Sequence, residues 1–113
     1  MRELVQQFFA GWTAHDANAV LAQFGQSFQL EDRIAGSSAL IADPSVLRDY
    51  LRSRFALGDA FSGVTADIPA SPSATNANAT AAFRRSFGDR VLSGNAKLVC
   101  GSGYLTEVLI GSQ

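Results

Sequence analysis

Apolar residues recur along the first half of the chain at helical spacing. Val5, Phe8, Phe9 and Trp12 lie three or four positions apart and predict a helix with one apolar face over residues 3–14. Two further helices are each expected to begin at an aspartate, which can accept hydrogen bonds from the first free amides of a helix. These helices are expected over residues 17–24, after Asp16, and over residues 45–57, after Asp43-Pro44.

The rest of the chain has the shorter, alternating pattern of β-strands. Strands are expected over residues 28–34, 61–68, 79–87, 91–100 and 104–110, with a brief one at 39–42. Residues 69–76 are rich in proline and small polar residues and predict a loop, and Gly101-Ser102-Gly103 predicts a tight hairpin. Helices followed by a run of strands indicate one α+β domain over residues 1–113 with a mostly antiparallel sheet. Three helices on one face of a curved sheet would enclose an apolar pocket.

One carboxylate interrupts an otherwise apolar strand face. Successive side chains of a strand point to opposite faces, so Phe28, Leu30, Asp32 and Ile34 share one side. A buried carboxylate is costly unless it is paired or hydrogen-bonded. Burial without a partner raises the pKa of a carboxylate, and a raised pKa is what a general base near neutral pH needs. Asp32 is therefore the candidate base. The alternative is that Asp32 reaches water, or is satisfied by Tyr50, Trp12 or a backbone amide.

Composition narrows the function further. The net charge of −1 gives no electrostatic footprint for nucleic acid, and no apolar stretch approaches membrane-spanning length. The single cysteine excludes an internal disulfide and favours a reducing, cytoplasmic location. One histidine without a cysteine cluster argues against a metal site, and no cofactor is expected.

The other charged residues are expected mostly at the surface. Arg84-Arg85 is interpreted as a solvated strand surface, and Asp59 is interpreted as a solvated loop residue. Arg54 interrupts an apolar helix face, so it could bind an anionic substrate group or extend to the rim of the domain.

The order and spacing of several segments resemble the NTF2-like superfamily, and within it the SnoaL-like and ketosteroid-isomerase-like group. The resemblance covers about residues 4–111 and rests on Val5-Gln6-Gln7-Phe8-Phe9-Ala10-Gly11-Trp12, Ala14-His15-Asp16, Val20-Leu21-Ala22-Gln23-Phe24, Leu30-Glu31-Asp32-Arg33-Ile34-Ala35-Gly36 and Val46-Leu47-Arg48-Asp49-Tyr50-Leu51. It implies a cone in which a curved sheet wraps a long helix around an apolar pocket. It also implies a homodimer formed through the outer face of the sheet.

The resemblance implies roles for three residues. Asp32 falls at the position of the proton-shuttling aspartate of ketosteroid isomerases. The tyrosine donor of those enzymes matches Phe8, which has no hydroxyl, and their second donor matches roughly Asn95, whose amide can donate. Two registers are open near Asn95: either Asn95 and Lys97 point inward, or the inward set is Ala96, Leu98 and Cys100 and Asn95 lies in a turn.

Two functions follow from this reading. The first is an enzyme of isomerase, cyclase or dehydratase type, in which Asp32 and Asn95 act on a small apolar molecule. The second is a non-catalytic ligand-binding or association module with the same fold. The pocket is expected to be lined by Phe8, Trp12, Phe28, Leu30, Tyr50, Leu51, Phe55 and Phe83.

Overall fold

The computed structural model describes residues 1–35, 40–68 and 77–112. In chain order its elements are α1 (Arg2–Thr13), α2 (Ala17–Leu21), β1 (Phe24–Asp32), α3 (Pro44–Phe55), β2 (Ala60–Asp67), β3 (Ala77–Phe87), β4 (Arg90–Gly101) and β5 (Tyr104–Ser112). Two helices precede the first strand, and the third lies between β1 and β2.

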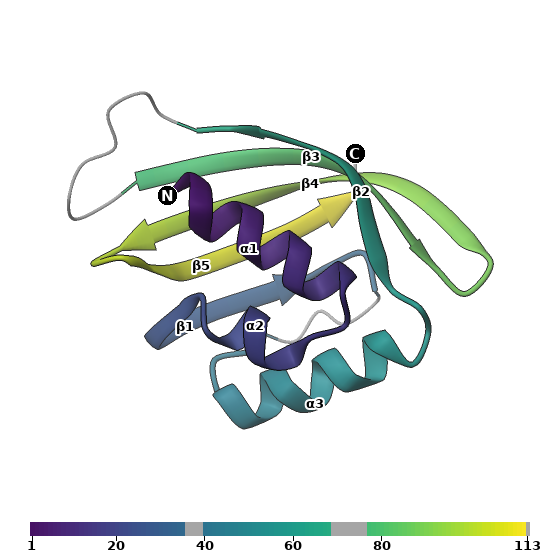
Figure 1. Cartoon of the computed structure of the whole chain (residues 1–113), viewed down its shortest axis with the longest axis horizontal. Coiled ribbons are helices and arrows are strands. Elements are labelled where there is room, and N and C mark those ends of the chain that lie inside the picture. Colours follow the sequence, from purple (N-terminus) through teal and green to yellow (C-terminus); the bar gives the residue numbers. More distant parts are fainter. Residues whose placement is uncertain (36–39, 69–76, 113) are drawn as a thin grey trace.

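The described strands form one curved sheet in the order β1-β5-β4-β3-β2 (Figure 1). Neighbouring strands pair antiparallel, except that β1 lies parallel to β5 at one edge. The helices lie on one side of the sheet, with α1 crossing in front of it and α3 packed below (Figure 1). The expected α+β fold is therefore confirmed, with a mixed sheet.

Both predicted helix caps are present. The Asp16 carboxylate accepts a hydrogen bond from the Ala19 amide at 3.1 Å at the start of α2. The Asp43 carboxylate accepts one from the Ser45 amide at 2.8 Å, with proline at the first position of α3.

The boundary after α2 differs from the prediction. The sequence predicts helix as far as Phe24, but α2 ends at Leu21 and Phe24 begins β1. Tertiary pairing explains the difference, because Phe24 lies opposite Leu105 of β5 and the Leu105 amide donates to the Gln23 carbonyl at 2.7 Å. Of the brief strand expected at 39–42, the described part is a single bridge between Ile41 and Leu30. The loop expected at 69–76 lies outside the described residues.

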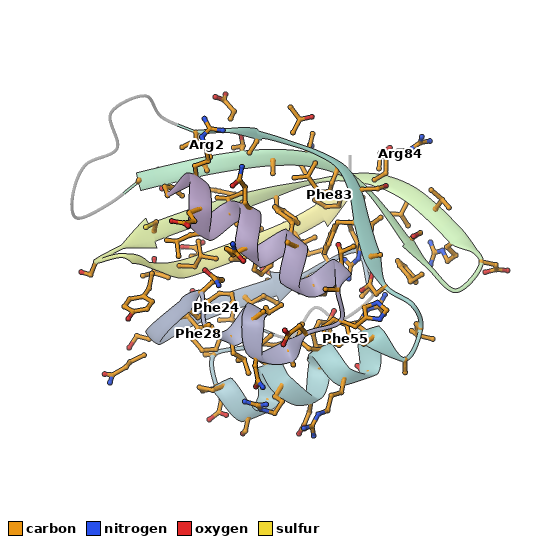
Figure 2. All side chains as sticks on the ribbon, viewed as in Figure 1. Arg2, Phe24, Phe28, Phe55, Phe83 and Arg84 are labelled. Carbon is orange, nitrogen blue, oxygen red and sulfur yellow. The ribbon has the colours of Figure 1, made fainter. Side chains whose placement is uncertain are left out.

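The inner face of the sheet and one face of α1 form the core. Val5, Phe8, Phe9 and Trp12 of α1 are all buried, as their spacing predicts. Aromatic rings connect α1 to the sheet: the Phe9 ring lies 5.0 Å from that of Phe61, centroid to centroid. Many apolar side chains point into the space between α1 and the sheet (Figure 2).

Candidate functional site

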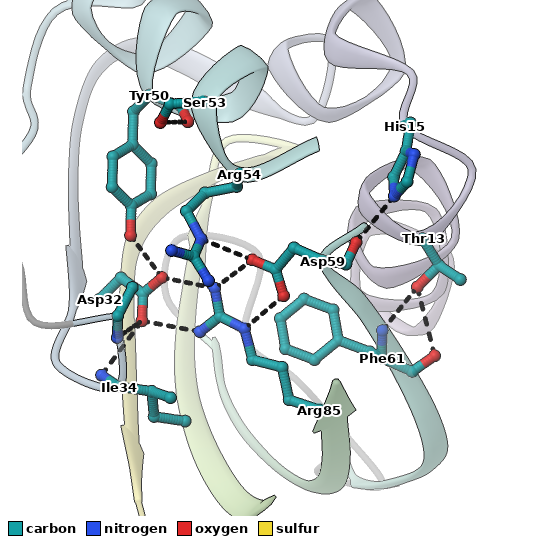
Figure 3. A network of polar contacts seen from close by, with 11 residues as sticks. Thr13, His15, Asp32, Ile34, Tyr50, Ser53, Arg54, Asp59, Phe61 and Arg85 are labelled. Atoms are coloured by element: carbon teal, nitrogen blue, oxygen red, sulfur yellow. Dashed lines mark hydrogen bonds and ion pairs between the residues drawn. The ribbon is translucent and has the colours of Figure 1, made fainter. Parts of the chain in front are cut away.

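Asp32 is the last residue of β1 and lies in the core at 1% exposure. Its carboxylate faces the guanidinium of Arg85, which comes from β3. Nη1 of Arg85 donates to Oδ1 at 2.8 Å and Nη2 donates to Oδ2 at 2.7 Å, so the pair is joined at two points (Figure 3). Such two-point geometry is among the strongest charge-assisted contacts in proteins.

Arg85 also binds a second buried carboxylate. Its Nε and Nη2 donate to the two oxygens of Asp59 at 2.8 and 2.6 Å, and Nε of Arg54 donates to the same carboxylate at 2.8 Å. Asp59 lies just before β2 and Arg54 lies on α3. Side chains from β1, α3, β3 and the residue before β2 therefore meet here. Asp32, Asp59, Arg54 and Arg85 form what we call the ion-pair cluster. Two carboxylates and two guanidiniums balance its charge.

Three further donors complete the surroundings of Asp32. The Tyr50 hydroxyl donates to Oδ2 at 2.6 Å, and the amides of Ile34 and Ala35 donate to Oδ1 at 3.2 and 3.4 Å. Both oxygens of Asp32 are thus engaged. This arrangement is the alternative that the sequence left open, in which Tyr50 and backbone amides satisfy the carboxylate.

The contacts of the cluster shift the pKa values of Asp59 and Arg85 in the directions expected for ion pairs. Burial alone would raise the pKa of Asp59, but hydrogen bonds and positive charge from Arg85 and Arg54 hold it below its usual value. Burial alone would lower the pKa of Arg85, but its contacts with Asp59 and Asp32 outweigh burial and hold its pKa above the usual value. The pKa of Tyr50 is raised, first by burial and then by the negative charge of Asp32.

Two buried donors beside the cluster have no acceptor among the described residues. They are Nε1 of Trp12, whose side chain is fully buried, and Nη2 of Arg54, at 7% exposure. Trp12 lies under the Arg85 guanidinium, whose central carbon is 5.3 Å from the indole, and its ring lies 6.4 Å from that of Tyr50. Because Tyr50 and Arg54 are one turn apart on α3, they are neighbours on that helix. A buried donor without an acceptor costs about 1–3 kcal/mol.

The structure corrects the interpretation of two charged residues. Arg85 and Asp59 were expected at the surface, but both are completely buried. The signal for Arg85 was present in the alternation, because Ala79, Ala81, Phe83 and Arg85 all point inward from β3 while Arg84 points out. Arg84 and Arg85 therefore differ in role although they are adjacent.

Asn95 does not lie on the same face as Asp32. In β4, Ala96 and Leu98 point inward, while Asn95 and Lys97 are exposed on the outer face. The second of the two registers is therefore the one observed, although Asn95 is part of the strand and not of a turn. The sheet separates the Asn95 amide from the ion-pair cluster.

The residues expected to line a pocket are brought together. Phe8, Trp12, Phe28, Leu30, Leu51 and Phe83 belong to the buried core, and Tyr50 and Phe55 pack against it half-buried. Their rings contact one another, as between Phe8 and Trp12 at 5.7 Å. Hollows of about 550, 400 and 880 Å³ lie on the outer sheet face, between α1 and β2, and at the start of β1. Tyr50 and Phe55 are half-buried, so the core beside the ion-pair cluster reaches the surface at these two side chains.

Two further observations concern residues 1–35, 40–68 and 77–112. No group of three or more histidine, cysteine or acidic side chains is arranged to hold a metal ion there. None of the helices described there is both long enough and apolar enough to cross a membrane.

Comparison with known proteins places the fold. No family model and no curated protein matches the sequence. Solved structures do match: a candidate polyketide cyclase from Xanthomonas campestris aligns with a TM-score of 0.75 and 15% identity, over 96% of this chain and 87% of the other. A candidate ketosteroid isomerase from Kribbella flavida gives 0.69 and 18%, over 99% and 76%. An NTF2-like protein of unknown function from Cytophaga hutchinsonii gives 0.75 and 8%, over 99% and 88%.

The sheet order, the crossing helix and these alignments define an α+β protein whose helices pack on one face of a curved sheet. The chain shares its fold with these structures, one of which is described as NTF2-like, and this is the fold that the resemblance in the sequence predicts. At these identities the similarity establishes the fold, and the activity has to be argued from the site.

Proposed function

We propose that this protein binds a small, mainly apolar molecule that carries a neutral oxygen acceptor, and that the acceptor lies beside the ion-pair cluster. The observation that carries the proposal is a pair of buried donors, Trp12 Nε1 and Arg54 Nη2, that have no acceptor within residues 1–35, 40–68 and 77–112. Buried polar atoms in folded proteins are satisfied by protein, water or ligand. A carbonyl or hydroxyl oxygen of a ligand would satisfy these two.

Charge balance favours a neutral ligand over an anionic one. Both guanidiniums of the cluster are already paired with carboxylates: Arg85 with Asp32 and Asp59, and Arg54 with Asp59. An added carboxylate would leave one negative charge in excess in a buried site, which is costly. A ketone, ester or alcohol adds no charge.

The apolar part of the ligand would lie against aromatic rings. The Trp12 ring lies edge to face with the rings of Tyr50 and Phe55, at centroid distances of 6.4 and 6.5 Å. Trp12 is buried, whereas Tyr50 and Phe55 are half-buried. Aromatic walls with a few placed polar atoms are typical of small-molecule sites. Entry would be from the side of α3, by movement of Tyr50 and Phe55.

A matched pair of ligands tests the proposal. 1-Tetralone has one carbonyl oxygen, and tetralin has the same bicyclic body without it. Because the chain has one tryptophan, the indole N–H signal in a ¹H–¹⁵N NMR spectrum reports on Trp12 alone. We expect tetralone to shift this signal and to bind about ten-fold more tightly than tetralin, the equivalent of one hydrogen bond. Equal binding of the two compounds, or an unmoved indole signal, would contradict the proposal.

Variants separate the donors from the apolar contacts. Trp12→Phe keeps an aromatic ring and removes the N–H, and Arg54→Lys keeps a positive charge opposite Asp59 and removes Nη2. Each should reduce the preference for tetralone over tetralin, measured by calorimetry. Phe8→Leu is the control, because it alters a buried ring of α1 without removing a donor and should weaken both compounds alike. Thermal unfolding of each variant establishes that it is folded.

Proton transfer by Asp32 is a second candidate function. It is favoured by the position of Asp32 on the inner face, bonded to Tyr50, and by the names of the cyclase and isomerase structures with this fold. Asp32 would take a proton from the carbon next to the ligand carbonyl, with Trp12 and Arg54 donating to the resulting oxyanion, and would return the proton to carbon. The five donors on Asp32 weigh against this function, since an oxygen would have to be released first.

Hydrogen exchange tests the second candidate without knowledge of the substrate. In D₂O, a protein base acting on bound 1-tetralone accelerates exchange at the carbon beside the carbonyl. Acceleration by the native protein that is lost in Asp32→Asn would support catalysis. No acceleration, or equal acceleration by the variant, would leave binding as the function.

A further inference from the structure

The turn after α1 holds a histidine in a backbone conformation that favours glycine. His15 has a φ of 59°, in the left-handed region. Its amide donates to the Trp12 carbonyl at 3.0 Å, and the Asp16 amide donates to the Gly11 carbonyl at 2.9 Å. These are the two hydrogen bonds of a Schellman helix end, in which glycine is the usual left-handed residue because a side chain there is strained.

The end of α3 has the same turn with glycine at that position. Gly58 has a φ of 71°, and its amide donates to the Phe55 carbonyl at 3.0 Å. The Asp59 amide donates to the Arg54 carbonyl at 3.2 Å. A Cβ at Gly58 would meet nothing within 4 Å. The side chain of His15, in contrast, has partners that can offset its backbone strain.

The His15 imidazole contacts two residues at the edge of the ion-pair cluster. Nε2 lies 2.9 Å from the Asp59 carbonyl oxygen, which can only accept, so Nε2 donates (Figure 3). The imidazole also stacks on the Phe55 ring, with centroids 4.9 Å apart and planes inclined by 21°. Phe55 lies edge to face with Trp12 at 6.5 Å. Trp12 is fully buried, Phe55 is half-buried and His15 is exposed, so these rings form a series from the core to the surface.

We infer that His15 keeps the entry to the ligand site closed by restraining Phe55. The inference rests on the proposed function, in which a ligand reaches Trp12 by movement of Tyr50 and Phe55. Tyr50 is restrained by its hydroxyl, which donates to Asp32. The side chain of Phe55 has no polar atom, so its restraint has to come from ring contacts.

The surrounding elements are held together by contacts other than those of His15. Thr13 Oγ1 accepts a hydrogen bond from the Phe61 amide at 3.0 Å and donates to the Phe61 carbonyl at 3.3 Å, which ties the end of α1 to β2. The Gly88 amide donates to the Leu57 carbonyl at 2.8 Å, which ties the end of α3 to the hairpin after β3. Loss of the imidazole should therefore free Phe55 without unfolding α1 or α3.

Hydrogen exchange at the Trp12 indole tests the inference without a ligand. The chain has one tryptophan, and exchange of its buried N–H with D₂O reports the fraction of molecules in which water reaches it. His15→Gly removes the stacking contact, the hydrogen bond and the backbone strain. It should accelerate indole exchange about ten-fold, as expected for the loss of these two contacts, and leave the thermal midpoint close to that of the native protein. Unchanged exchange, or native exchange as fast as that of an exposed indole, would overturn the inference.

Two variants separate the imidazole from the flexibility of the turn. Asparagine tolerates the left-handed conformation but has no ring, so His15→Asn should accelerate exchange as His15→Gly does. Native-like exchange in His15→Asn would overturn the role of the ring. Ala14→Gly loosens the same turn, keeps the imidazole and should leave indole exchange unchanged. Equal acceleration in Ala14→Gly would assign the effect to the backbone and would also overturn the inference.

The binding kinetics of 1-tetralone distinguish this inference from the proposed function. Because the restraint acts on the free and the bound protein alike, His15→Gly should raise the association and dissociation rates equally, by about ten-fold, and leave the affinity unchanged. A lower affinity with an unchanged association rate would show that His15 only supports the site and would overturn the inference. Accelerated indole exchange without binding of tetralone would support the closing role of His15 and contradict the proposed ligand.

Discussion

Arg85 and Asp32 lie 53 residues apart in the sequence, yet they form a two-point ion pair in the middle of the core. Each is at most 1% exposed, and Arg85 extends the contact to Asp59. Three segments of the chain, at the end of β1, before β2 and in β3, therefore meet at one guanidinium. This relationship makes Asp32 part of the structural framework, whatever further role it has.

Removing the Arg85 guanidinium should lower the free energy of unfolding more than a substitution at a neighbouring surface position. Arg85→Met leaves two buried carboxylates without their common partner, and breaking a buried pair in this way costs about 3–5 kcal/mol. Urea unfolding should therefore show a strongly reduced free energy of unfolding. Arg84→Met is the matched control, because Arg84 is exposed on the other face of β3 and its loss should change stability by less than about 0.5 kcal/mol. Equal effects of the two substitutions would contradict the framework role.

Stability should fall at acid pH through Asp59. Because the pKa of Asp59 in the folded protein lies below its usual value, the ionised form is favoured by folding. The resulting stabilisation is complete above the pKa of an unfolded aspartate, about 3.9, and is lost as the pH falls through the lower folded value. The free energy of unfolding, measured between pH 6 and pH 2.5, should decline below about pH 4.

Asp59→Asn provides the comparison for this acid profile. The variant is expected to be less stable at neutral pH, because Arg54 and Arg85 lose a charged acceptor. Its stability should nevertheless decline less steeply below pH 4 than that of the native protein. An unchanged slope would assign the acid sensitivity to other carboxylates.

Some of the fold follows from the sequence alone. The stripe of apolar residues on α1 and the caps at Asp16 and Asp43 are local features, and each forms as predicted. The alternation in β3 also gives the correct inner face. The parallel pairing of β1 with β5 is not predictable from local pattern, because it depends on two segments about eighty residues apart.

The site could be predicted only in part. Asp32 on an apolar face signalled a buried carboxylate, and Tyr50 was among the partners considered for it. Its main partner was missed because arginine at a strand position is usually solvated. Asp59 carried no local signal at all, since its burial depends on Arg54 and Arg85 reaching it from α3 and β3.

Tyr50 should remain protonated at a pH at which an ordinary tyrosine ionises. Burial and the adjacent Asp32 carboxylate raise its pKa, because a second negative charge beside Asp32 is unfavourable. The chain has two tyrosines, so the absorbance change of tyrosinate near 295 nm can be assigned by comparison with Tyr50→Phe. The native protein and the variant should show the same change up to about pH 11 while folded. A larger change in the native protein would show that Tyr50 ionises normally.

Alkaline stability gives the same prediction from another measurement. A raised folded pKa means that the stabilisation from the Tyr50 hydroxyl is complete below the unfolded pKa of about 10 and is lost as the pH rises further. Tyr50→Phe should lower the free energy of unfolding at neutral pH by about 1.5–3 kcal/mol, the contribution of a hydrogen bond to a charged group. It should also remove the part of the alkaline decline that Tyr50 causes.

A side chain at Gly94 should disrupt the packing of β4 against β5. A Cβ placed there would lie 2.6 Å from the Gly111 carbonyl oxygen of β5, and 2.8 Å from both Ile34 and Phe83. The backbone has to move to relieve a contact that short. Gly94→Ala should therefore lower the free energy of unfolding by about 1–3 kcal/mol, the usual range for overpacking. Gly111→Ala is the control on the paired strand, because a Cβ there meets nothing within 4 Å. Thermal unfolding should show a large fall in midpoint for Gly94→Ala and a small change for Gly111→Ala. The reverse order would mean that β4 and β5 are not packed as closely as their register indicates.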